Sequence, residues 1–260
     1  MKRSSIRSIR LLQIEQIILD KKILTWNELQ EKFKISKNTL RRDIDEIIKK
    51  GTVKKVYGGV KATSENSKIV DFIKRNDKEK ENKNATAKVA ADYIQDNDII
   101  FVDSGTTTVH IADYLHGKNN ITLITNNIGI ISKVARMKNV VLICLGGRIN
   151  RRTYSFVGPY TLNYLQSLNI DKAFMAATGL TIKSGPSNSL YDENEIKSHV
   201  VKRAEQIFLL IDHTKFDKNT LLSYCDFKNI DYIITDKAPD EYKKEAKKFG
   251  VKLIESTLKT

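Results

Sequence analysis

The chain has 260 residues, of which 40% are hydrophobic, so it can bury a core and form one large domain or two unequal ones. Its net charge is +14, and residues 1–61 hold 16 Lys/Arg against 7 Asp/Glu, an excess that favours a polyanionic partner over a basic surface kept only for solubility. Two distant cysteines exclude a disulfide framework, and the absence of a signal peptide or a long apolar run predicts a cytoplasmic protein without membrane contact.

Residues 1–35 are expected to form two helices. Apolar side chains recur at helical spacing up to about Asp20, which predicts the first helix. Thr25 and Glu28 have the spacing of a capping box, so a short second helix is expected to run on to about Phe33. A tight turn at residues 33–35 leads into a third helical pattern, and two short helices joined in this way are typical of a helix-turn-helix.

The third predicted helix, residues 36–50, has two unlike faces. Ser36 is suited to cap its first turn, and Gly51 is suited to end it. One face carries an apolar stripe at helical spacing, made of Leu40, Ile44, Ile47 and Ile48. The other carries amide, hydroxyl and guanidinium groups near its N-terminal end, which suits entry into a DNA major groove. Taken alone it is more simply a solvated surface helix, but its neighbours favour DNA binding.

Residues 52–60 predict a two-stranded wing, because valines alternate with lysines before the pair Gly58-Gly59. The wing could lie along phosphates while the helix contacts bases. We therefore expect residues 1–61 to be a winged helix-turn-helix domain that binds double-stranded operator DNA. The candidate DNA-binding residues are Ser36, Lys37, Asn38, Thr39, Arg41, Arg42, Lys54, Lys55 and Tyr57.

The segment from 24 to 60 resembles the N-terminal DNA-binding region of the DeoR family of bacterial transcriptional regulators. The matching residues are Ser36, Thr39, Arg41-Arg42-Asp43, Gly51 and Gly58-Gly59. The resemblance implies that Arg41, Arg42 and their neighbours contact operator DNA. Trp26 and the basic pair Lys54-Lys55 depart from the family pattern.

Residues 62–84 are polar with mixed charges, which predicts an exposed linker containing a short helix at 69–75, although a helix continuing into 85–94 is equally possible.

Residues 85–260 alternate apolar runs with amphipathic helices, which predicts a mostly parallel α/β domain with helices on both faces of its sheet. The expected strands are 99–102, 121–125, 140–145, 173–176, 207–211, 232–235 and 251–254. The expected helices are 86–94, 107–115, 128–135, 160–168, 193–204 and 240–249.

Polar and glycine residues follow several of these strands, where ligands bind in such folds. The loop after the first strand is suited to bind an anion, because it offers three threonine hydroxyls and backbone N–H groups. Gly105 in this loop lets a ligand approach the backbone closely. No P-loop or three-glycine fingerprint is present, which disfavours ATP, GTP and NAD. Each group alone is more simply a cap or turn, but together they favour a sugar phosphate. The candidates are Asp103, Ser104, Gly105, Thr106, Thr107, Thr108, Asn126, Gly146, Gly147, Arg148, Asp212 and Lys215.

The resemblance to the DeoR family extends over most of the chain. The motifs that carry it here are 103–108, Thr125-Asn126, Gly146-Gly147, Val157-Gly158, Ala173-Phe174, Thr178-Gly179, residues 193–197 and Lys215-Phe216. It adds Gly179 to the candidate effector site, and it implies a sensor domain similar in fold to ribose-5-phosphate isomerase. Many family members are repressors released by phosphorylated intermediates of carbohydrate uptake. Asp217 departs from the glycine expected after Phe216.

The expected function is therefore a repressor of carbohydrate uptake or catabolism genes, acting as a dimer or tetramer and released from its operator by a phosphorylated sugar. One alternative is a sugar-phosphate isomerase-like enzyme that uses Asp103, Glu193, Asp212 and Lys215 as acid and base groups. Another is a nucleic-acid-binding module without a small ligand. The four histidines lack metal-ligand spacing and no nucleophile motif is present, so no metal, cofactor or catalysis is expected.

Overall fold

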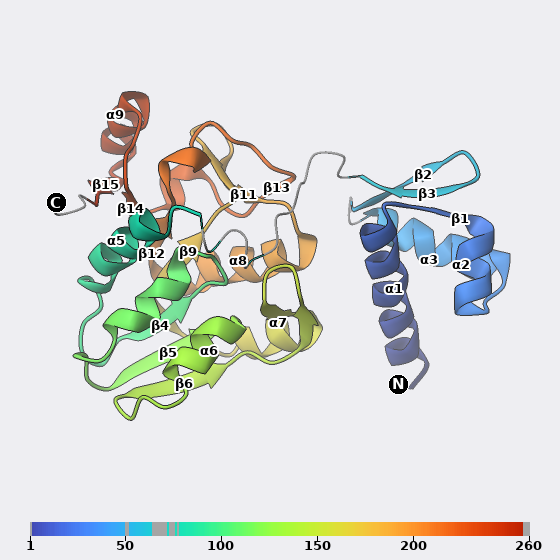
Figure 1. Ribbon diagram of the computed structural model, residues 1–260, viewed down its shortest axis with the longest axis horizontal. Helices are drawn as coiled ribbons and strands as arrows, with labels where there is room; N and C mark the ends of the chain where they lie inside the picture. The colour runs from blue at the N-terminus through green and yellow to red at the C-terminus, as the bar shows by residue number, and fades with distance from the viewer. Residues whose placement is uncertain (1, 50–51, 64–71, 73–75, 77, 257–260) are drawn as a thin grey trace. The chain divides into compact units, whose positions relative to one another are not determined.

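The computed structural model describes residues 2–49, 52–63, 72, 76 and 78–256 (Figure 1). The chain divides into two compact units, Met1–Lys68 and Ile69–Thr260. The expected linker, residues 62–84, meets ordered structure at both ends, since Ala62 ends a strand and Lys80 begins a helix. The short helix expected at 69–75 lies outside the described residues except for Phe72.

The first unit is a winged helix-turn-helix, as predicted. Its elements are α1 (Lys2–Lys21), β1 (Ile23–Thr25), α2 (Trp26–Phe33), α3 (Lys37–Lys49), β2 (Val53–Val56) and β3 (Gly59–Ala62). The stripe residues Leu40, Ile44 and Ile47 are fully buried in one core with residues of α1 and α2. Thr25 and Glu28 form the predicted capping box of α2.

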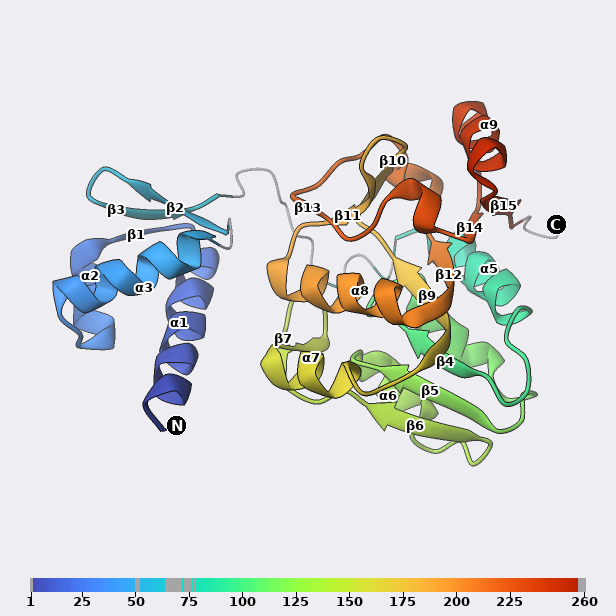
Figure 2. The same ribbon diagram turned by 180° about the vertical axis from the view of Figure 1, so that it is seen from behind.

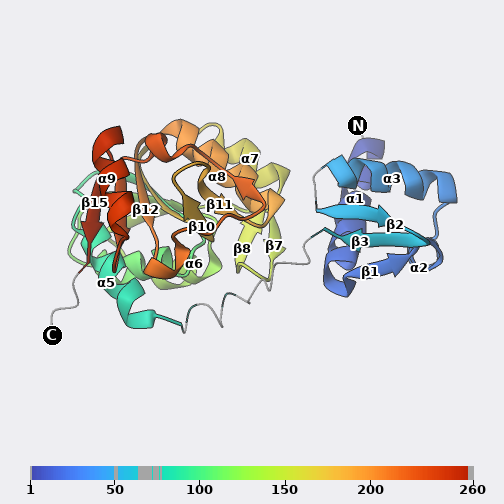
Figure 3. The same cartoon turned by 90° about the horizontal axis from the view of Figure 1, so that it is seen from above.

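The wing contains a third strand that the sequence pattern did not indicate. β1 pairs antiparallel with β3 in the order β1-β3-β2, and the three strands lie side by side in Figure 3. The turn of the hairpin is Tyr57-Gly58, and Gly59 is already the first residue of β3. A side chain at Gly59 would meet the Leu24 carbonyl oxygen at 2.2 Å, so glycine is needed there for the close approach of β1.

The second unit is built on a parallel sheet of seven strands in the order β15-β14-β12-β9-β4-β5-β6, which confirms the predicted α/β architecture. These strands are β4 (Ile99–Val102), β5 (Ile121–Thr125), β6 (Val140–Cys144), β9 (Ile170–Ala176), β12 (Ala204–Leu210), β14 (Tyr232–Thr235) and β15 (Lys252–Glu255). The helices are α5 (Lys80–Ala91), α6 (Ile128–Val134), α7 (Pro159–Leu165), α8 (Tyr191–Arg203) and α9 (Asp240–Phe249), with the 3₁₀ helices η1 (Thr108–Tyr114), η2 (His213–Lys215) and η3 (Phe227–Asn229).

Helices cover both faces of this sheet. On the face seen in Figure 1, α5, η1 and α6 pack against alternate strand residues that include Ile100, Phe174 and Phe208. On the opposite face, seen in Figure 2, α7 and α8 pack against residues that include Phe101 and Met175. Since the central strands are buried on both faces, they contain continuous apolar runs, which is why the sequence pattern indicated them clearly.

Two expectations for this unit need correction. Residues 107–115, expected as an α-helix, form the 3₁₀ helix η1. Five short strands were missed: β7 (Arg148–Asn150), β8 (Ser155–Val157), β10 (Gly179–Thr181), β11 (Gly185–Asn188) and β13 (Leu222–Ser223). They are two to four residues long and rich in polar residues, glycine or proline, so they carry no periodic pattern. No helix in the described part of the chain is long and apolar enough to cross a membrane.

Candidate functional site

The third helix is anchored to α1 by a buried acid. Asp43 on α3 is 1% exposed, and it accepts hydrogen bonds from Arg7 Nε at 3.2 Å and from Arg10 Nε at 2.8 Å. Arg7 also contacts Glu46 at 2.6 Å. Because these contacts lie on the same side as the apolar stripe, they fix α3 along α1 and leave its other face open to solvent.

The open face of α3 carries the predicted DNA-binding residues. Ser36, Lys37, Asn38, Arg41 and Arg42 are exposed, and Thr39 is half-buried. The Ser36 hydroxyl accepts a hydrogen bond from the Thr39 amide at 3.2 Å, as expected for a helix cap.

The wing residues are also exposed, but they are not equivalent. Tyr57 is fully exposed in the turn, and Lys54 is exposed on β2. Lys55 forms an ion pair with Asp45 of α3, both partners being about half exposed.

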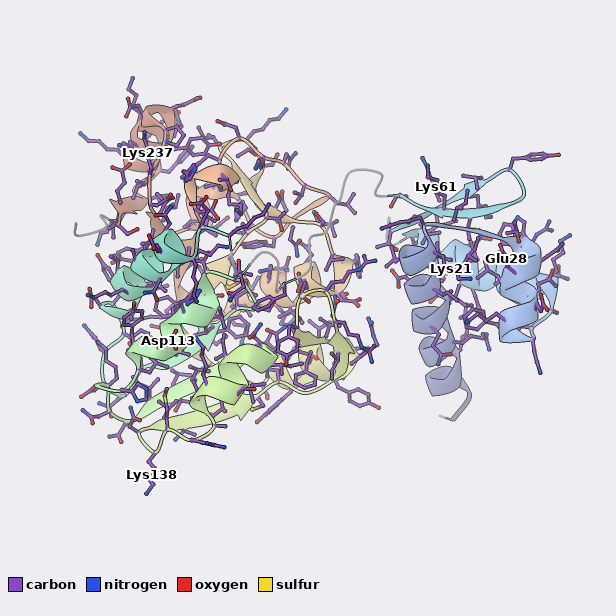
Figure 4. The ribbon with its side chains drawn as sticks, viewed as in Figure 1. Lys21, Glu28, Lys61, Asp113, Lys138 and Lys237 are labelled. Carbon is purple, nitrogen blue, oxygen red and sulfur yellow. The ribbon has the colours of Figure 1, made fainter. Side chains whose placement is uncertain are left out.

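Lys61 on β3 and Glu28 at the start of α2 are labelled in Figure 4. The hydrogen bonds that Thr25 donates from its amide and hydroxyl lower the pKa of Glu28.

The second unit holds a cavity of about 620 Å³ at the carboxyl ends of its central strands. Much of its wall comes from the residues that follow β4, β9 and β12. β4 and β9 are neighbours in the sheet, but the chain leaves them for opposite edges, so their loops diverge at the point where ligands bind in such folds. Of the predicted effector residues, Ser104, Gly105, Thr106, Thr107, Asp212 and Lys215 line the cavity.

The loop after β4 is tightly organised. Thr108 Oγ1 accepts from the Gly105 amide at 3.0 Å and donates to the Asp103 carbonyl at 2.6 Å. A side chain at Gly105 would meet Ala176 Cβ at 2.2 Å, so packing on β9 already requires glycine, whether or not a ligand approaches. In the described part of the chain, no group accepts a hydrogen bond from the amides of Thr106 and Thr107. The loop can therefore offer two backbone donors to an anion.

A buried ion pair lies beside this loop. The Lys197 ammonium donates to the Asp103 carboxylate and to the Ala176 carbonyl, the latter at 2.9 Å. Asp103 and Lys197 side chains are 1% and 5% exposed. Tyr224 completes the site, with its ring 5.5 Å from the ammonium and its hydroxyl donating to Ala176 at 3.1 Å, and burial raises its pKa well above the ordinary value. Lys197 was missed, although it belongs to the 193–197 motif.

A second ion pair lies at the other side of the cavity. Lys215 Nζ donates to both carboxylate oxygens of Asp212, at 2.9 and 2.7 Å, and to Thr214 Oγ1 at 2.8 Å. Burial by itself would raise the pKa of Asp212, but the Lys215 charge and the hydrogen bonds from Lys215 and Thr214 outweigh it and lower the pKa. Asp217, which replaces the expected glycine, has a left-handed φ of 55° and is held by Tyr242, whose hydroxyl donates to its carboxylate at 2.9 Å.

Seven predicted effector residues do not line the cavity. Asp103 and Thr108 belong to the loop after β4 described above, and the other five have different surroundings. Asn126 donates to the Phe156 carbonyl at 2.9 Å, and Arg148 pairs with Asp192. Gly146 and Gly147 follow β6, the edge strand of the sheet, and a side chain at Gly147 would meet Thr161 Oγ1 at 2.5 Å. Gly179 lies in β10, where a side chain would meet the Lys218 carbonyl oxygen at 2.2 Å. Gly147 and Gly179 therefore have packing reasons of their own, whereas a side chain at Gly146 would meet open space.

Several residues of the cavity wall were not predicted as effector-binding. The polar ones are Lys78, Glu79, Lys83, Thr153, Thr178, Asn188, Glu193, Lys197, Thr214 and Lys218. Among the described residues, the wall holds five lysines and three acidic side chains, so the cavity favours an anion that also has hydroxyl groups to donate to carboxylates. No group of three or more possible metal ligands occurs in the described ranges.

Comparison with known proteins agrees with both units. The profile of the DeoR-like helix-turn-helix domain matches residues 10–66, and that of the DeoR C-terminal sensor domain matches residues 78–237. The chain is 40% identical over 233 residues to the HTH-type transcriptional regulator IolR of Bacillus subtilis, covering 90% of this chain and 92% of that protein. It is 24% identical to the glycerol-3-phosphate regulon repressor of Escherichia coli, covering 87% of this chain and 89% of the relative.

Solved structures are matched more weakly. Ribose 5-phosphate isomerase from Plasmodium falciparum has 16% identity and a TM-score of 0.39 over 54% of each chain, a likeness too low to support a functional argument. The family profiles and the full-length relatives are sufficient without it. Together they establish that the chain belongs to the DeoR family of DNA-binding transcriptional regulators.

Proposed function

We propose that the chain is a repressor that binds operator DNA through α3 and the wing, and that a phosphorylated sugar filling the cavity of the second unit releases it. The observation that carries the proposal is the cavity itself, which combines two free backbone amides, several lysines and carboxylates where parallel strands diverge. Phosphate suits the amides and lysines, and sugar hydroxyls suit the carboxylates. The E. coli relative is named a repressor, which supports repression rather than activation of transcription.

The mechanism is a population shift in a homodimer or homotetramer. A ligand that binds one arrangement of the subunits better than another changes the fraction of molecules whose two α3 helices match the half-site spacing. Catalysis is not part of the proposal. The lowered pKa of Asp212 makes it a poor proton acceptor near neutral pH, and the relatives are named as regulators.

Thermal-shift screening tests the ligand class. Each of a set of pentose, hexose and triose phosphates is compared with its unphosphorylated parent, because a ligand at 100 times its Kd stabilises the folded state by about 2.7 kcal/mol. We expect at least one phosphorylated compound to raise the melting temperature and to release the protein from DNA upstream of its coding sequence in a gel-shift assay. Stabilisation by none of them, or turnover of one into an isomer, would reject the proposal.

A further inference from the structure

Lys83 places the start of α5 in the wall of the cavity. Its side chain is only 4% exposed, and it lines the same space as the loop after β4 and Lys215. Its ammonium donates to the backbone carbonyl of Lys78, which lines the cavity too. Lysine is seldom buried to this extent, and its place in the wall lets the ammonium meet an anion in the cavity.

The chain just before α5 has a second attachment to the cavity wall. Phe72 is 7% exposed, its amide donates to the Arg152 carbonyl at 3.0 Å, and its ring centre lies 6.1 Å from that of Tyr154. Thr153, between those two partners, is buried and lines the cavity. The chain that leads out of the first unit is therefore attached to the cavity wall at Phe72 and again at Lys83.

α5 is also packed on the element that follows the anion-binding loop. Ala87, Ala90 and Ala91 of α5 share a core with Val109 and Ile111 of η1, and the two helices are in direct contact. η1 begins at Thr108, the residue that organises the loop. A shift at the first turn of α5 is thus coupled by packing to the element that follows the anion-binding loop.

We propose that Lys83 binds the phosphate group of the effector, so that filling the cavity changes the hydrogen bonding of the chain between Phe72 and Lys83. This inference rests on the function proposed above. The hydrogen bond from Lys83 to the Lys78 carbonyl has one charged partner, whereas a hydrogen bond from Lys83 to phosphate has two, so a phosphate competes with the carbonyl for the ammonium. When the cavity fills, the hydrogen bond from the Lys83 ammonium to the Lys78 carbonyl is lost, while the Lys83 amide still donates to the Glu79 carbonyl. By linkage, any change that holds that turn in place also weakens effector binding.

Hydrogen exchange of the full chain, with inorganic phosphate as the probe, tests this inference. In the wild type we expect phosphate to slow exchange in a peptide covering 103–109 and to change exchange in a peptide covering 76–86. Lys83→Met should weaken phosphate binding about tenfold, and at saturating phosphate only the 103–109 response should remain. Lys83→Arg, which keeps the charge, should restore the 76–86 response. Lys88→Met, on the exposed side of α5, is the matched control and should behave as the wild type.

The outcomes separate the two proposals. If phosphate leaves 103–109 unchanged in the wild type, the cavity is not an anion site and the proposed function fails. If 103–109 responds but 76–86 does not, or if 76–86 still responds fully in Lys83→Met, only the role of Lys83 is overturned. If Lys83→Met does not fold, Lys83→Gln takes its place in the same comparison, because it also removes the charge.

Discussion

The two units hold their charged side chains in opposite ways. In the first unit the cations expected to meet DNA, Arg41 and Arg42, are exposed, and the buried charge Asp43 serves to hold α3 on α1. In the second unit the cations line a cavity, and Lys197 and Lys215 are each paired with a carboxylate. A long polyanion is met by a surface of mobile cations, whereas a small anion needs charges already oriented at the site. Changes to each unit should therefore have separable effects.

The largest effect is expected from Asp103→Ala. It leaves the Lys197 ammonium, 5% exposed, without its carboxylate, and breaking a buried pair in this way costs about 3–5 kcal/mol. Urea unfolding followed for the second unit would measure the loss. The matched control is Asp212→Ala, which should cost less because its partner Lys215 is 27% exposed. An equal loss of unfolding free energy in the two variants would contradict the idea that burial of the lysine partner sets the cost.

Arg42→Ala should come next and should act on DNA alone. Loss of one base or phosphate contact is expected to weaken operator binding by about 1–3 kcal/mol, roughly 5- to 150-fold, measured by fluorescence anisotropy at fixed salt. Lys215→Met should leave operator affinity unchanged and blunt the response to a phosphorylated sugar. If both variants weakened DNA binding equally, the division of roles between the units would be wrong.

Ser36→Ala should destabilise the first unit by about 1 kcal/mol, because the Thr39 amide loses its acceptor at the start of α3. Circular dichroism melting measures this change. Ser36→Gly is the control, since glycine is a tolerated cap and should cost only a few tenths of a kcal/mol. A Ser36→Ala variant as stable as the wild type would show that the cap contributes nothing to α3.

The smallest effect is a pH dependence at Asp212. Its pKa is lowered in the folded state, so its ion pair stabilises the second unit fully above the ordinary carboxyl pKa of about 4, and that stabilisation disappears as the pH falls through the lowered value. Asp212→Asn should thus be less stable than the wild type at pH 7, and the gap should close in strong acid. A gap that is independent of pH would mean that the ion pair is not its cause.

Local patterns were sufficient for much of this fold. The winged helix-turn-helix follows from caps and a 3.6-residue apolar period, and β4, β5, β14 and α9 have the predicted bounds, because each depends on neighbours within a few residues. Asp212 and Lys215 were each predicted for the site because they follow the strand pattern at 207–211 directly. They reached the cavity, as did Ser104–Thr107, because they follow β12 and β4, the two neighbours of β9.

Only the tertiary structure decided which strand ends meet. Asn126 and Arg148 follow strands of the same apolar character, but β5 and β6 lie toward one edge of the sheet, and strand order depends on packing between distant segments rather than on any local pattern. Lys197 reaches Asp103 across 94 residues, and Lys83 enters the cavity because α5 packs on η1. The amino-acid sequence by itself determined the longer helices and strands and the family, while long-range packing produced the short strands and selected the side chains that share the cavity.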